Sequence, residues 1–220
     1  PYSVPIDTKK LSSKELKNLS KDLMFTSTGE GVIIGKNTTK GVVLRGYSPL
    51  DFQHLEFIKN GKFIGNSKKL NENSVSIGKS LSLDYNLNVG DKISIMSTTG
   101  VETIIGTLPK QETYIITSIF ESGLSDFDLN VVFLNIKSLE SLFDIEPSDR
   151  NLEIYLNNPL NIELNKKKVQ KIFSQEFVYS WADMNSSLFS ALKVERNVMF
   201  IILSLIIIVA AFNIISGLTI

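Results

Sequence analysis

Residues 197–220, NVMFIILSLIIIVAAFNIISGLTI, form the longest stretch of this chain without a charged side chain. An α-helix rises about 1.5 Å per residue, so roughly 20 apolar residues cross the hydrocarbon core of a bilayer. The stretch also lacks the polar face that a helix on the surface of a soluble protein has. It therefore predicts a membrane-spanning helix, and the alternative is a fully buried helix of a large soluble protein.

The helix is expected to begin before the membrane does. Asp183 is a suitable N-cap, and no helix-breaking residue occurs between positions 184 and 205. Lys193, Glu195 and Arg196 precede the apolar run, as expected where a helix leaves water. A helix over residues 184–220 would be about 55 Å long, which exceeds the bilayer core. The pattern thus predicts a stalk above the membrane.

Composition excludes several classes of function. The chain has 23 basic and 23 acidic residues among 220, so it carries no net charge that would favour nucleic acid. It has no cysteine, which rules out disulfides and thiolate metal sites. The residues before the apolar run suffice for one domain or two small ones. Because the chain starts at Pro1 and stops inside an apolar run, we expect a longer membrane protein.

The segment before the apolar run mixes short strand and helix patterns, which predicts an α+β fold. The residues that favour strands are β-branched and alternate with polar ones, and glycine or asparagine separates them from the helices. Strands are predicted at residues 32–34, 41–46, 62–64, 74–77, 93–96, 113–120, 130–134 and 152–156, and helices at 79–85, 138–143 and 161–173.

Residues 98–109 have two interpretations. Gly100, Gly106 and Pro109 punctuate the stretch, and a strand pattern follows it. This is typical of a plain β-hairpin. The alternative is a protruding arm with Ile104 and Ile105 near its tip, where exposed apolar side chains would indicate a docking site.

No pattern predicts catalysis, a metal or a cofactor. Gly78-Lys79-Ser80 is similar to the end of a phosphate-binding loop, but Asn73 stands where that motif requires glycine. His54 is the sole histidine, which argues against a zinc site or a catalytic triad. Lys166, Lys167 and Lys168 are most simply the solvated face of a helix.

Three segments carry a resemblance to a known family. They are residues 41–49 (GVVLRGYSP), residues 77–93 with the pattern G-x-x-L followed by L-x-V-G-D-x-I, and residues 181–216 with the core AAFNII. In this order they resemble LolC and LolE, the permease subunits of the bacterial lipoprotein-releasing ABC transporter. The resemblance covers nearly the whole chain except its first 30 residues.

The resemblance implies an inner-membrane permease subunit with a large periplasmic domain of the MacB-like α+β type. It implies a discontinuous membrane-proximal subdomain (1–49 and 109–182), an inserted subdomain (50–108), and a stalk with a transmembrane helix (183–220). It implies a separate LolD-like ATPase subunit, so that this chain is not itself an enzyme. It further implies a second permease subunit, either LolE-like or a second copy of this chain.

The resemblance also implies two binding regions. Residues 98–109 match the hook that holds the periplasmic carrier LolA, and Gln111 matches the adjacent pad, although Glu112 stands where an arginine is usual. The second membrane helix would line a cavity for the acyl chains of the lipoprotein. The residues concerned are Thr103, Ile104, Ile105, Gly106, Thr107, Leu108 and Pro109 in the hook, and Met199, Ile202, Leu203 and Ile206 in the cavity.

Two other classes remain open at this point. A mechanotransmission ABC permease of the MacB or FtsX type, acting in efflux or in the control of a cell-wall hydrolase, would share the fold and stalk but lack a carrier-binding hook. A single-span periplasmic binding or signalling protein would have one membrane helix in the full-length chain, whereas the permeases have four.

Overall fold

A computed structural model describes residues 6–35, 39–103 and 106–220 of the chain. The chain divides into two compact units, Pro1–Asn157 and Asn158–Ile220. The first unit contains all the strands of the described residues, and the second is helical. This confirms the predicted α+β fold followed by a long apolar helix.

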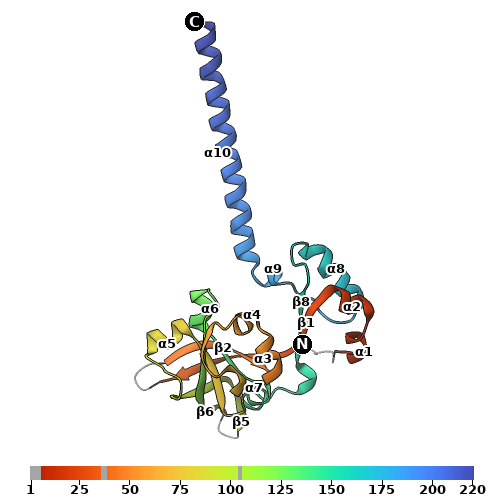
Figure 1. Ribbon diagram of the computed structural model, residues 1–220, viewed down its shortest axis with the longest axis vertical. Coiled ribbons are helices and arrows are strands. Elements are labelled where there is room, and N and C mark those ends of the chain that lie inside the picture. The colour runs from red at the N-terminus through yellow and green to blue at the C-terminus, as the bar shows by residue number, and fades with distance from the viewer. Residues whose placement is uncertain (1–5, 36–38, 104–105) are drawn as a thin grey trace. The chain divides into compact units, whose positions relative to one another are not determined.

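The first unit is built on an eight-stranded sheet, six strands of which pair in a closed ring. In the ring, β1 pairs with β2, β2 with β7, β7 with β4, β4 with β6, β6 with β5, and β5 with β1 again. The β2–β7 and β4–β6 pairs are parallel, and the others are antiparallel. We call this ring the barrel (Figure 1). Its strands are β1 (Ser20–Ile34), β2 (Thr39–Tyr47), β4 (Ser74–Gly78), β5 (Lys92–Thr103), β6 (Gly106–Phe120) and β7 (Val131–Asn135).

The other two strands extend this sheet at its margins. Strand β3 (Phe63–Gly65) pairs with the end of β6, and β8 (Asn151–Leu156) pairs with the first part of β1. Strand β1 is long enough to pair with three strands, with β8 over Ser20–Thr26, with β2 over Thr26–Ile34 and with β5 over Gly31–Ile34. Because β8 ends just before Asn157, it is the last strand before the helical unit.

Short helices connect the strands, and local sequence signals set their ends. Ser48 caps α3 by accepting a hydrogen bond from the Asp51 amide at 3.1 Å, with Pro49 in the first turn. Asn86 and Asp144 end α5 and α7 in the left-handed conformation, with φ of 51° and 56°. The helices of this unit are α1 (Thr8–Leu11), α2 (Lys14–Leu19), α3 (Pro49–His54), α4 (Glu56–Lys59), α5 (Lys79–Tyr85), α6 (Ser125–Asn130) and α7 (Ile136–Phe143).

Two apolar clusters stabilise the first unit. One cluster gathers aliphatic side chains of the barrel strands, such as Ile77 and Ile95, with Leu139 and Leu142 of α7. The other is aromatic and joins α3 and α4 to the sheet, with ring centroids of Phe120 and Phe133 4.9 Å apart. Full burial of one such side chain contributes about 1.5–3 kcal/mol, so these clusters are the main source of stability.

The second unit contains α8 (Ile162–Ile172), α9 (Trp181–Met184) and α10 (Ser186–Thr219). Asp183 does not cap the long helix, so that prediction is wrong. It is the third residue of α9, where its carboxylate and Ser180 form a capping box, and α10 begins three residues later with Asn185 as its N-cap. The Lys166 ammonium donates to Asp183 Oδ2 at 2.7 Å, and this bond, with those from Ser180, holds the Asp183 pKa well below its usual range.

The predicted subdomain boundaries stay a prediction. Strands β4 and β5, from residues 50–108, pair with β6, β7 and β1, which lie wholly or mostly outside that range. Both predicted parts thus contribute to one sheet, and the described chain divides instead between Asn157 and Asn158.

Candidate functional site

Strands β5 and β6 form a hairpin whose distal half leaves the barrel. The pairing of β1 with β5 ends at Ser97, and the pairing of β4 with β6 begins at Ile115. Between these limits the two strands pair with each other, from Gly100 opposite Pro109 to Thr103 opposite Gly106. We call residues 98–109 the distal hairpin. Among the described residues, no third strand pairs with the distal hairpin. This favours a protruding arm over a hairpin inside the sheet.

A break in register marks the start of the distal hairpin. The β5–β6 pairing shifts between Met96 and Gly100, so the ladder is irregular there. Such irregularities bend a strand and increase its twist. At the far end Gly106 has a φ of +119°, a conformation that favours glycine. Glycine at position 106 therefore fits this end of the described ladder without backbone strain.

The predicted hook residues lie at the end of this ladder. Thr103, Gly106 and Thr107 belong to the last two pairs of the ladder, and Leu108 pairs opposite Val101. Leu108 is 53% exposed, and Pro109 beside it is also exposed. Ile104 and Ile105 lie outside the described residues. An exposed leucine and proline on a protruding ribbon form an apolar surface that a partner can cover.

Gln111 lies at the base of the distal hairpin, exposed and opposite Met96 in the ladder. Its neighbour Glu112 accepts a hydrogen bond from the buried Tyr114 hydroxyl at 2.7 Å. Burial first, and then the Glu112 carboxylate, raise the Tyr114 pKa above its usual range. The carboxylate at position 112 therefore satisfies a buried hydroxyl of the barrel, a role that an arginine does not fill.

Helix α10 carries the predicted acyl-chain residues. It is the one helix of the described residues that is long and apolar enough to cross a membrane, and it is not buried against the rest of the chain. Met199, Ile202, Leu203 and Ile206 are spaced by three and four residues, so they share one side of the helix. All four are exposed in this unit.

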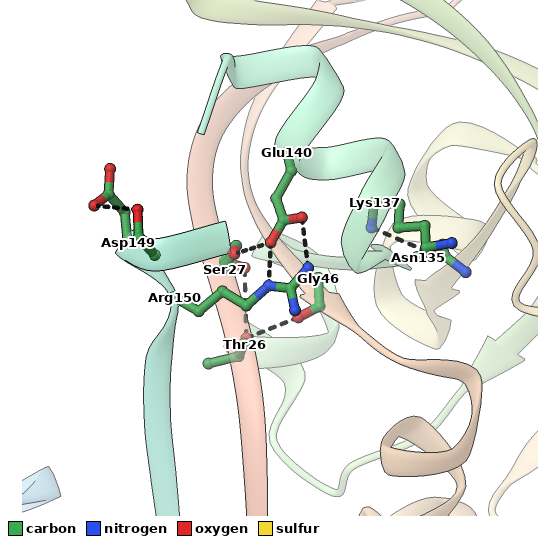
Figure 2. A network of polar contacts seen from close by, with 9 residues as sticks. Thr26, Ser27, Gly46, Asn135, Lys137, Glu140, Asp149 and Arg150 are labelled. Atoms are coloured by element: carbon green, nitrogen blue, oxygen red, sulfur yellow. Dashed lines mark hydrogen bonds and ion pairs between the residues drawn. The ribbon is translucent and has the colours of Figure 1, made fainter. Parts of the chain in front are cut away.

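A buried ionic network that the sequence analysis did not predict ties α7 to the strands. Glu140 is only 8% exposed and accepts two hydrogen bonds from the Arg150 guanidinium, at 2.6 and 2.8 Å. The Ser27 hydroxyl of β1 donates to the same carboxylate at 3.0 Å (Figure 2). These bonds to Glu140 raise the Arg150 pKa. The signal in the sequence for this buried charge was the spacing of Glu140, which places it with Ile136, Leu139 and Phe143 on the apolar face of a helix.

A second network joins β2 to β8. Glu153 of β8 pairs with Arg45 of β2 and accepts hydrogen bonds from the hydroxyls of Tyr47 at 2.7 Å and Tyr155 at 3.0 Å. Burial is the main cause that raises the Tyr155 pKa to about 12, and Glu153 adds to it. Both tyrosines thus stay protonated as donors, and the network fixes the strand that leads out of the first unit.

The described residues offer no group of three or more histidine, cysteine, aspartate or glutamate side chains that could hold a metal ion. The ionic networks above use their charged groups internally, in pairs with good hydrogen-bond geometry. The distal hairpin and α10 both carry exposed apolar side chains. Exposed apolar side chains of this kind are suited to contacts with a partner or with a membrane.

These features define a class: an α+β domain with a protruding hairpin, joined to a helix long enough to cross a membrane. No family model matches the chain. It is 25% identical over 178 residues to the "Lipoprotein-releasing system transmembrane protein LolC" of Xylella fastidiosa, covering 80% of this chain and 43% of that protein. The LolC proteins of Haemophilus influenzae and Buchnera aphidicola are 29% and 26% identical, covering 65% and 96% of this chain.

The chain spans 36% and 51% of the length of those two relatives. Among solved structures, it is similar to the periplasmic region of MacB from Actinobacillus actinomycetemcomitans, with a TM-score of 0.49 and 9% identity over 84% of this chain and 82% of that one. The extracellular domain of the ABC-type transporter YknZ matches 78% of this chain and 89% of its own, with a TM-score of 0.42 and 9% identity. The sequence is thus similar to LolC proteins over most of its length, in agreement with the resemblance to the LolC and LolE family.

Proposed function

We propose that this chain is part of a permease subunit that extracts lipoproteins from the inner membrane and hands them to a periplasmic carrier. The names of the LolC relatives support lipoprotein release. The observation that carries the proposal is the distal hairpin, which leaves the barrel as a two-stranded ribbon and presents an exposed leucine and proline. Such a ribbon offers apolar area and free strand edges to a partner.

In this proposal the barrel lies in the periplasm, and α10 spans the inner membrane. A LolD-like ATPase on the cytoplasmic side supplies the energy by ATP hydrolysis. A second permease subunit, LolE-like or another copy of this chain, completes the membrane part. The side of α10 with Met199, Ile202, Leu203 and Ile206 faces the acyl chains of the lipoprotein. The distal hairpin and Gln111 hold the LolA carrier that receives it.

The test is site-specific photo-crosslinking in cells that express the complete transporter. A photo-reactive residue replaces Leu108 in the hairpin, and in the control it replaces Leu83, which is 70% exposed on α5 of the same unit. We expect Leu108 to crosslink to a small soluble lipoprotein carrier and Leu83 not to. Absence of a carrier adduct at Leu108, with the transporter assembled, contradicts the proposal and favours a mechanotransmission permease without a carrier.

A further inference from the structure

The distal hairpin is anchored at its base on both strands. On β5, the Thr98 hydroxyl donates to the Glu30 carbonyl of β1 at 2.7 Å. On β6, the Lys110 ammonium donates to the Ser141 carbonyl of α7. Between the anchors, the buried Ser97 hydroxyl accepts from the Lys110 amide at 3.2 Å. Outward of Thr98 and Lys110, the described strands form cross-strand pairs from Gly100–Pro109 to Thr103–Gly106, and the Ser97 hydroxyl donates to the Thr99 carbonyl.

The carbonyl that Lys110 binds is one that the helix itself leaves open. The last four carbonyls of a helix have no amide partner within it. In α7 the Glu140 carbonyl receives the amides of Asp144 and Ile145, the latter at 3.0 Å. Ser141 is the next residue, and its carbonyl receives the lysine. A cation is also favoured at this end of a helix because the helix dipole is negative there.

Helix α7 is a fixed reference for this contact. Leu139 and Leu142 are fully buried in the aliphatic cluster, and Glu140 is held by Arg150 and Ser27. The Phe143 ring covers Gly29 so closely that a Cβ there would come within 2.7 Å of it. Gly29 precedes Glu30, the acceptor of Thr98. Both anchors therefore end on one rigid pair of elements, α7 and β1.

We propose that Thr98 and Lys110 are positioning residues that set the direction in which the distal hairpin leaves the barrel; this rests on the carrier-binding role of that hairpin. A two-stranded ribbon is marginally stable by itself, and the register break after Met96 is a natural point for it to swing. Carrier binding needs the hairpin in one orientation, since holding a binding element in place avoids an entropic cost on association. The two side-chain anchors supply that restraint.

The experiment measures the hairpin direction without the carrier. In the full-length permease within its transporter, with native cysteines replaced, spin labels are placed on cysteines at Leu108 and Leu83. Pulsed electron resonance then gives the distribution of distances between the labels. We expect Lys110→Met to broaden the distribution of distances. The double variant, Lys110→Met with Thr98→Val, is expected to broaden it further. Lys110→Arg keeps a donor and is expected to restore the narrow distribution.

Lys92→Met is the matched control, because Lys92 is an exposed lysine at the start of β5, in the same hairpin. The proposal is overturned if the distance distribution of Lys110→Met is as narrow as those of the wild type and of Lys92→Met. Unchanged hydrogen-exchange protection of the β4 amides shows that the barrel still folds.

In the crosslinking assay at Leu108, we expect about fivefold less carrier adduct in Lys110→Met, which corresponds to one hydrogen bond. If the wild type gives no adduct while the distribution still broadens, the positioning role stands and the carrier-binding role fails.

Discussion

At the scale of single residues, close backbone approaches constrain this chain more than its charges do. Gly78 ends β4 and caps α5, and its α-carbon faces the backbone of Asp128 in α6. A Cβ built at this glycine would lie 2.0 Å from the Asp128 carbonyl oxygen. Gly78, which is similar to the end of a phosphate-binding loop only in local sequence, is thus required by the close packing of α5 against α6.

Gly78→Ala is therefore expected to destabilise the barrel by about 3 kcal/mol, since overpacking against backbone forces a main-chain shift. Hydrogen exchange of the β4 amides measures the change as a loss of protection. Gly41→Ala is the matched control, because a Cβ at that strand glycine meets nothing within 4 Å. Equal protection in the two variants would contradict the packing argument.

Glu140 is a single residue whose buried charge constrains the fold. Its carboxylate is buried, and a buried charge costs several kcal/mol unless it is paired and hydrogen-bonded. Two bonds from Arg150 and one from Ser27 supply the pairing. The bonds join residues 10 and 113 positions apart in sequence. The network therefore contributes to the position of α7, the element on which the Lys110 contact depends.

At the scale of elements, helix α10 is long enough for both a membrane span and the predicted stalk. It has 34 residues, about 50 Å of helix, against a bilayer core of roughly 30 Å. Lys193, Glu195 and Arg196 mark the transition between the two parts. The remaining length of about 20 Å, nearly four turns, corresponds to the predicted stalk. The helix begins at Ser186 rather than at residue 184.

If the predicted cavity is correct, the two sides of the membrane span differ in function. Ile206→Lys places a charge on the side shared with Met199 and Ile202, whereas Ile208→Lys places it about 160° away around the helix. Each lysine costs a similar amount for insertion, roughly 3 kcal/mol at the helix centre. We expect Ile206→Lys to reduce lipoprotein release at least tenfold and Ile208→Lys to retain most of it.

The measurement is the fraction of lipoprotein released from membranes or spheroplasts to added carrier, normalised to permease inserted in the membrane. Normal release by Ile206→Lys at normal insertion would exclude this side of α10 as the acyl-chain surface. A similar loss in both variants would indicate a general defect of the helix and would also count against the cavity.

At the scale of the whole molecule, the barrel and the distal hairpin are separable. The ring of strands uses the residues of β5 up to Ser97 and the residues of β6 from Gln111 onward. The aliphatic core lies within this ring. The described residues of the distal hairpin contribute nothing to either apolar cluster. The described core of the barrel therefore does not include the distal hairpin.

Replacing residues 100–109 by a short glycine-serine turn is expected to leave the folding of the barrel unchanged within about 1 kcal/mol, since loop length affects stability weakly. Carrier binding should fall to background. Protection of barrel amides measures the first effect, and retention of the carrier on immobilised transporter measures the second. Carrier retention by the shortened protein would contradict the role of the hairpin, and loss of barrel protection would contradict its independence.

Local signals in the sequence determined much of this protein. The apolar run predicted α10, Lys79–Tyr85 was predicted with the bounds that the structure gives, and strands β3, β4 and β7 lie within about one residue of their predicted ranges. The hairpin over residues 98–109 was also predicted, because glycine permits backbone conformations that other residues avoid and proline fixes φ. Such features depend on neighbouring residues alone.

Only the tertiary structure decided how these elements close and where the charges lie. The closure of β1 onto β5, the bond between Ser27 and Glu140, and the Lys110 contact with Ser141 join residues from 31 to 113 positions apart. A pattern of hydrophobic residues indicates that a face is buried, but it does not indicate against which partner. The direction of the hairpin depends on such contacts, because an isolated ribbon has no fixed orientation and acquires one only by packing and bonding to a rigid neighbour.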